Sequence, residues 1–83
     1  MGAIDEEGAM PLWRQVYWLL RARIESGEIP PGRALPSKAR TVQETGVTGN
    51  TVEHAIRQLK ADGFVTGVQG RGVFVNAPGQ WMS

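Results

Sequence analysis

The sequence predicts a single α+β domain of three helices followed by a β-hairpin. Two patterns predict it: apolar residues recur at helical spacing near 11–26 and 49–62, and two short apolar runs flank a glycine-rich loop near the C-terminus. The length of the chain agrees with a single domain, because 83 residues suffice for one hydrophobic core but not for two. We expect a domain over 10–76, a flexible acidic arm over 1–9 and a tail over 77–83.

The first helix is predicted over 11–26. Pro11 suits a first turn, and apolar residues then follow every fourth position, as on a helix face packed against a core: Leu12, Val16, Leu20 and Ile24. Gly27 and the Pro/Gly-rich stretch 27–32 end this helix in a turn. A short strand is expected at Ala34-Leu35.

The second helix is predicted over 38–45, between a Ser37 cap and Gly46. The third is predicted over 49–62, between a Thr48 cap and Gly63, with one apolar face: Val52, Ala55, Ile56 and Leu59. Strands are expected over 64–68 and 73–75, joined by the loop 69–72. This is the element order of a winged helix-turn-helix, whose third helix enters the DNA major groove.

Composition narrows the function classes. The chain has no cysteine and one histidine, so neither a disulfide nor a zinc site is expected, and we expect no metal and no cofactor. Neither a secretory signal nor a membrane span is evident, which favours the cytoplasm. Net charge is only +1, but three of the eight acids lie in the arm, leaving a mildly basic domain.

Several short motifs occur in a fixed order along residues 11–75. They are Pro11-Leu12-Trp13-Arg14-Gln15-Val16, Ile24-Glu25-Ser26-Gly27, Pro31-Gly32-Arg33-Ala34-Leu35-Pro36-Ser37, Gly46-Val47-Thr48-Gly49-Asn50-Thr51-Val52, Ala55-Ile56-Arg57-Gln58-Leu59, Gly63-Phe64-Val65 and Gly70-Arg71-Gly72-Val73-Phe74-Val75. In this order and spacing the chain resembles the N-terminal domain of GntR-type bacterial transcription regulators. The resemblance implies a winged helix-turn-helix that binds duplex DNA, as a repressor at an inverted-repeat operator.

The same resemblance indicates two differences between this sequence and the family: the effector domain and several basic positions. Proteins of the family usually continue into a larger domain that binds a small effector and supplies the dimer contacts. We therefore expect no small-molecule effector on this chain alone. The family also commonly carries Glu-Arg after Pro-Ser, Arg at the start of the third helix and a basic residue after Thr-Val, where this sequence has Lys38-Ala39, Gly49 and Glu53.

The candidate DNA contacts lie in the predicted helix-turn-helix and the hairpin loop: Lys38, Arg40, Thr48, Gly49, Asn50, Thr51, His54, Arg57, Gln69, Gly70 and Arg71. Asn50 and Thr51 suit base edges, or else cap the helix locally. Gly49 either lets the backbone approach the duplex or reflects relaxed DNA contacts. His54 is expected on the exposed face of the helix, as a contact or as plain surface, and Arg57 at a phosphate.

Two further regions carry candidate cations. Lys38 and Arg40 lie in a first helical turn, where the helix dipole disfavours positive charge, so they indicate either phosphate contact or tolerated surface charge. Arg71, at the predicted hairpin tip, is placed to enter a minor groove, with Gln69 beside it at a phosphate or base edge. The alternative is that 69–72 form a simple turn.

The main alternative function is a winged-helix protein-interaction module, favoured by the modest charge, Gly49 and Glu53. RNA binding is less favoured because no stacking aromatics line a strand. An enzyme is not expected, since no base and nucleophile converge.

A homodimer is the last expectation. Trp18 points away from the predicted core stripe and should be exposed. We therefore expect Trp18 and Leu19, aided by Trp81 and Met82, to form a symmetric dimer contact. A single exposed tryptophan without a role is the alternative.

Overall fold

A computed structural model of the chain describes residues 8–82 and confirms three helices and a hairpin. Helix α1 spans Leu12–Glu25, α2 spans Lys38–Thr45 and α3 spans Gly49–Ala61. Strands β1 (Val65–Val68) and β2 (Gly72–Val75) pair antiparallel, with Val65 opposite Val75 and Val68 opposite Gly72. Every predicted helix and strand is present, with ends shifted by at most one residue.

The helix ends follow from local chemistry. The Ser37 hydroxyl accepts from the Arg40 backbone N–H at 3.1 Å, and the Thr48 hydroxyl accepts from that of Thr51 at 3.4 Å, so both predicted caps form. Gly46 ends α2 at φ +78°, a left-handed conformation that costs glycine little.

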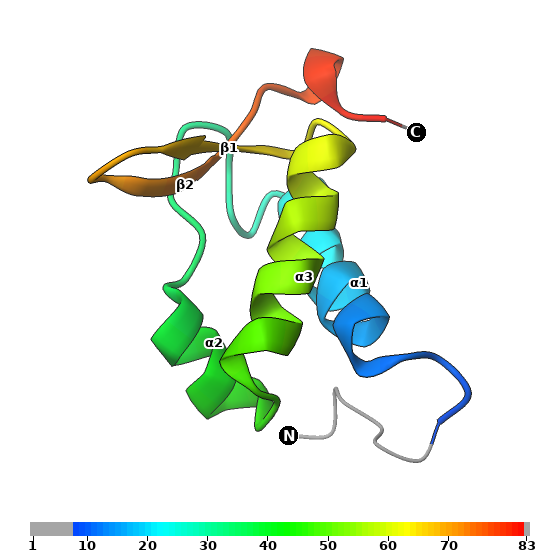
Figure 1. Cartoon of the computed structure of the whole chain (residues 1–83). Helices are drawn as coiled ribbons and strands as arrows, with labels where there is room; N and C mark the ends of the chain where they lie inside the picture. Colours follow the sequence, from blue (N-terminus) through cyan, green and yellow to red (C-terminus); the bar gives the residue numbers. More distant parts are fainter. Residues whose placement is uncertain (1–7, 83) are drawn as a thin grey trace.

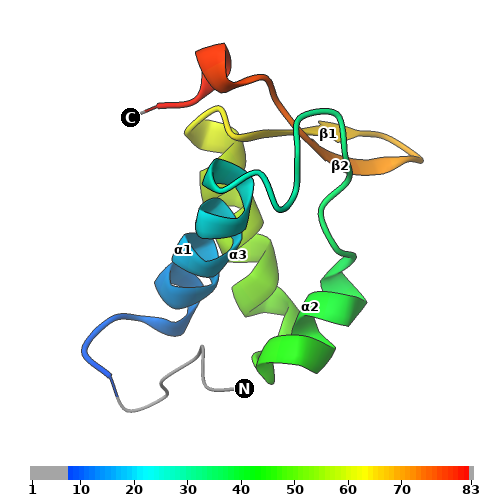
Figure 2. The same ribbon diagram turned by 180° about the vertical axis from the view of Figure 1, so that it is seen from behind.

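The core lies between α1 and α3. Its largest fully buried side chains come from α1, α3 and the residue before β1: Val16, Leu20, Ile24, Val52, Leu59 and Phe64. Residues 32–35 run beside β2, and Ala34 pairs with Phe74 as an isolated bridge, which confirms the short strand expected there. In both views α2 and the hairpin project to the same side of the α1–α3 pair (Figures 1 and 2).

The C-terminal segment departs from the predicted domain boundary at residue 76. A 3₁₀ turn, Pro78–Gln80, returns the chain to the end of α3 (Figure 1). Trp81 stacks on Phe64 at a centroid distance of 5.4 Å, its indole N–H donates to the Asn76 carbonyl, and the Met82 backbone N–H donates to the Asp62 carbonyl. Residues 77–82 are thus packed onto the domain, whereas most of the predicted flexible arm lies outside the described residues.

Candidate nucleic-acid interface

The exposed face of α3 carries a polar stripe. Asn50, Glu53, Arg57 and Lys60 are exposed and follow one another at intervals of three, four and three residues, so they share one side of the helix. The opposite side is buried at Val52, Ala55 and Leu59. Glu53 and Lys60 are not among the predicted contacts, although their spacing from Asn50 and Arg57 in the sequence indicates a shared face.

Two predicted contacts at the start of α3 are engaged with each other. The hydroxyls of Thr48 and Thr51 lie 3.0 Å apart, and Thr51 is half-buried. The local capping role weighed for Thr51 is therefore present. Asn50 is exposed beside them, and its side chain points to no partner among residues 8–82.

The predicted exposure of His54 is wrong. Its ring stacks on Trp13 of α1 with centroids 4.1 Å apart and planes at 16°, and the residue is half-buried. The physical reason is that α1 packs along α3 at this point, so His54 serves the interface between the two helices.

A groove runs between α3, the start of α2 and the hairpin. Four cations line it from three elements, together with a single carboxylate: Lys38, Arg57, Lys60, Arg71 and Glu53. Within the described chain, Arg57, Lys60 and Arg71 form no ion pair. Three unpaired cations along one groove make this face positively charged, although the net charge of the whole chain is only +1.

Lys38 crosses from α2 to α3. Its ammonium donates to the Glu53 carboxylate at 2.5 Å, and its side chain passes over Gly49. This hydrogen bond lowers the pKa of the Glu53 carboxyl, and the positive charge of Arg57 acts in the same direction, so Glu53 is ionised at neutral pH.

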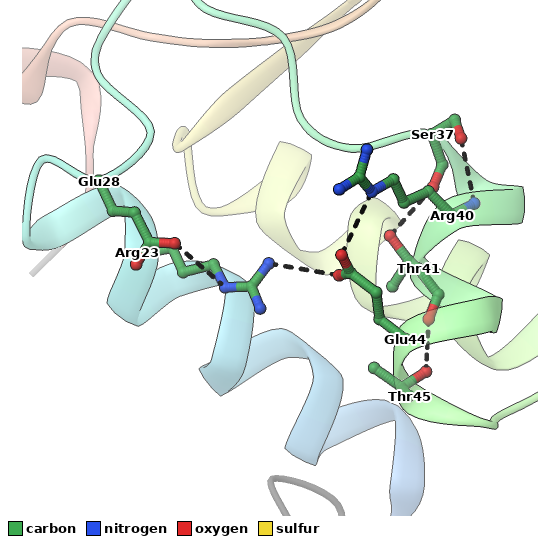
Figure 3. A network of polar contacts seen from close by, with 7 residues as sticks. All are labelled: Arg23, Glu28, Ser37, Arg40, Thr41, Glu44 and Thr45. Carbon is green, nitrogen blue, oxygen red and sulfur yellow. Dashed lines mark hydrogen bonds and ion pairs between the residues drawn. The ribbon is translucent and has the colours of Figure 1, made fainter. Parts of the chain in front are cut away.

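Arg40 belongs to a chain of ion pairs that joins α2 to α1 (Figure 3). Its guanidinium lies 3.2 Å from the Glu44 carboxylate, which also lies 3.6 Å from Arg23, and Arg23 lies 3.8 Å from Glu28. Thr41, beneath them, is buried and donates its hydroxyl to the Ser37 carbonyl. The Arg40 side chain remains 69% exposed, so its pairing leaves it accessible to an anion.

The hairpin loop is a tight turn. The Arg71 backbone N–H donates to the Val68 carbonyl at 2.9 Å, and Gly70 has φ +78°, which fits the third position of a type II turn. Gln69, Gly70 and Arg71 are all exposed. The predicted hairpin is therefore present, with Gly72 as the first residue of β2.

The four residues predicted at a dimer contact lie in different environments, and Met82 among them is exposed. Trp18 is 42% exposed, with the Arg21 guanidinium 4.7 Å from its ring, and Leu19 is half-buried. Trp81 is held against Phe64 within the domain.

Among residues 8–82 no cluster of His, Asp or Glu could hold a metal ion, and no helix is long and apolar enough to cross a membrane.

Comparison with known proteins agrees with this arrangement. The model of the family described as "Bacterial regulatory proteins, gntR family" matches residues 12–75. The chain is 38% identical over 72 residues to the histidine utilization repressor of Pseudomonas putida, covering 87% of this chain and 29% of the relative. It is 40% identical over 68 residues to the mannosyl-D-glycerate transport/metabolism system repressor MngR of Escherichia coli, covering 82% and 28%. The chain thus spans less than a third of the length of these relatives.

Solved structures show the same fold. YtrA from Sulfolobus acidocaldarius, a GntR-family transcription factor, superposes with a TM-score of 0.80 at 34% identity over 89% of this chain and 78% of that chain. The DNA-binding domain of AraR, in complex with operator ORR3, gives a TM-score of 0.79 at 32% identity over 90% of both chains. The fold is a winged helix-turn-helix, and the chain belongs to the gntR family of bacterial regulatory proteins.

Proposed function

We propose that this chain binds duplex DNA sequence-specifically as the DNA-binding part of a bacterial transcription repressor. The observation that carries the proposal is the groove beside the exposed stripe of α3, in which Arg57, Lys60 and Arg71 form no ion pair with residues 8–82. Unpaired cations along a helix and a hairpin supply the positive charge that duplex phosphates attract. The similar AraR domain, in complex with operator DNA, supports the same use of this fold.

Each element then has a distinct role. Helix α3 enters the major groove, where Asn50 and Thr51 contact base edges and the small Gly49 lets the backbone approach. Arg57 and Lys60 neutralise phosphates, and Lys38 and Arg40, each paired with a carboxylate, face the same duplex. The hairpin inserts Arg71 at the minor groove, with Gln69 and Gly70 against the backbone.

The chain binds as a homodimer on an inverted repeat in this proposal, with Trp18 and Leu19 at the contact between protomers. Exposure of Trp18 supports it, because large aromatic side chains are enriched at such contacts. Sedimentation of the wild type and Trp18→Ala across micromolar concentrations, with and without DNA, tests this step. A monomer under every condition contradicts it.

Salt-dependent binding tests the main proposal. Each neutralised phosphate contributes about −0.9 to the slope of log K against log salt, so three unpaired cations predict a slope of about −3 per protomer. Arg57→Ala or Arg71→Ala should make that slope less steep by about one. Arg14→Ala is the control, because Arg14 is an exposed cation on α1 that forms no ion pair within residues 8–82 and does not line the groove.

The alternative is a protein-interaction module. A folded wild type that binds no duplex at low salt would contradict the proposal and leave the interaction module. Equal losses in Arg57→Ala and Arg14→Ala would also contradict it, since they would show that binding depends on total charge and not on this groove.

A further inference from the structure

Lys38 and Glu53 form a donor and an acceptor held side by side on the face proposed to meet DNA. Lys38 opens α2, and Glu53 lies between Asn50 and Arg57 on the exposed stripe of α3. The ammonium and the carboxylate are 2.5 Å apart, yet the two side chains remain 51% and 49% exposed. The pair is therefore formed in the unbound domain and accessible to a ligand.

Gly49 makes this pairing possible. A Cβ at position 49 would meet Cδ, Cε and Nζ of Lys38 at 3.5, 3.7 and 3.9 Å. A methyl group fits at these distances, but a longer side chain would occupy the path of Lys38. The absence of a side chain at Gly49 thus leaves Lys38 room to reach Glu53 across the first turn of α3.

A carboxylate at this place is unfavourable for non-specific binding, because it faces a polyanion. It becomes favourable only opposite a hydrogen-bond donor. In the major groove the donors are the amino groups of cytosine and adenine. Glu53 lies in the middle of the stripe with Lys38 hydrogen-bonded to it, which is the position of a group that selects a base.

We propose that Lys38 and Glu53 together recognise one C·G base pair. The Glu53 carboxylate accepts from the N4 amino group of cytosine, and the Lys38 ammonium donates to O6 or N7 of the paired guanine. This inference rests on the proposed DNA binding and adds to it the residues that set specificity at one position.

The order of groups on the base edges favours C·G over A·T. In an A·T pair the adenine amino group lies between two acceptors, adenine N7 and thymine O4, so a carboxylate there faces an acceptor on each side. In a C·G pair the cytosine amino group has an acceptor, guanine O6, on one side only. Lys38 stands on one side of Glu53, which matches that asymmetry.

Selection of bound sequences from a random duplex pool tests this. The wild type should enrich a cytosine at one position of each half-site, and replacing that C·G pair by T·A should weaken binding about 5-fold or more. Glu53→Gln should move the preference at that position to adenine, because glutamine pairs with adenine N6 and N7. Lys38→Met should weaken the cytosine preference at the same position.

Glu25→Gln is the matched control. Glu25 is also ion-paired, to Arg21, and its side chain is 45% exposed, but it lies on α1 and does not line the groove. This variant should keep the wild-type preference. Thermal melting of all variants checks that each is folded.

The outcomes separate this inference from the proposed function. If Glu53→Gln binds DNA with the wild-type base preference, the inference fails and the proposed function stands. A wild type that selects adenine at that position overturns the inference in the same way. A wild type that binds duplexes without any preference overturns the inference and also the sequence specificity of the proposed function. A wild type that binds no duplex overturns both.

Discussion

Gly63 follows α3 and lies against the C-terminal segment, so its replacement by alanine tests whether that segment is part of the domain. Gly63 has φ +81°, a conformation that costs an L-residue about 1–2 kcal/mol. A Cβ there would also overlap the carbonyl oxygen of Gln80, a backbone atom that cannot rotate away. Gly63→Ala should therefore displace residues 77–82.

The magnitude follows from what is displaced. Two hydrogen bonds, from Trp81 Nε1 and from the Met82 backbone, contribute about 1 kcal/mol each. The stacked Trp81–Phe64 pair adds about 0.5–1.5 kcal/mol. With the backbone term, Gly63→Ala should lower the free energy of unfolding by about 3.5–5.5 kcal/mol.

Urea unfolding of matched variants measures this. Gly46→Ala is the control, since Gly46 has φ +78° with open space around it, so it should cost only the backbone term of about 1–2 kcal/mol. In a chain ending at Asn76, Gly63→Ala should cost no more than Gly46→Ala does. The reasoning is refuted if Gly63→Ala costs the same in the full and the shortened chains.

Three further outcomes are expected. Burial, and after it the hydrogen bond to a neighbouring carboxylate, raises the pKa of Tyr17, the only tyrosine, above 10.0. The stabilising contribution of Tyr17 is therefore present below pH 10 and is lost as pH rises through the native pKa. Absorbance titration should show this, and ionisation at or below pH 10 in the folded state would contradict it. His54→Ala should lower stability by about 1 kcal/mol through loss of the Trp13 stack while changing DNA affinity less than about 2-fold; the reverse pattern would restore His54 as a contact. Glu44→Gln should change stability by less than about 1 kcal/mol and raise DNA affinity by releasing Arg40, which a binding titration checks against the wild type.

The elements could be predicted because their signals are local. Ser37 and Thr48 cap helices by bonding to backbone groups three residues away, and Gly46 ends α2 through its own backbone conformation. Such signals depend little on the rest of the chain. The helix bounds therefore agree with the structure to within one residue.

The parts that were missed depend on contacts between distant segments. His54 lies on the side of α3 that α1 covers, and periodicity alone shows the apolar face but not where a neighbouring helix extends over polar residues. Trp81 is separated from any periodic segment, and only its stacking on Phe64 reveals its role. The Lys38–Glu53 pair joins α2 to α3 and depends on how these helices pack, whereas the Arg40–Glu44 pair has the local i,i+4 spacing and could have been predicted from the sequence.

The departures from the family pattern at Lys38, Gly49 and Glu53 have to be interpreted together. In the sequence, Gly49 and Glu53 stand where the family has basic residues, and each taken alone favours weakened DNA binding, whereas Lys38 stands where the family has a glutamate. In space they form one unit, in which Lys38 passes over Gly49 to neutralise Glu53. A single Gly49→Arg substitution would then add a cation, block the path of Lys38 and change the environment of the Glu53 carboxylate at once. Substitutions at residues in direct contact are not additive, so neither the affinity nor the specificity of this domain follows from counting the basic residues it retains.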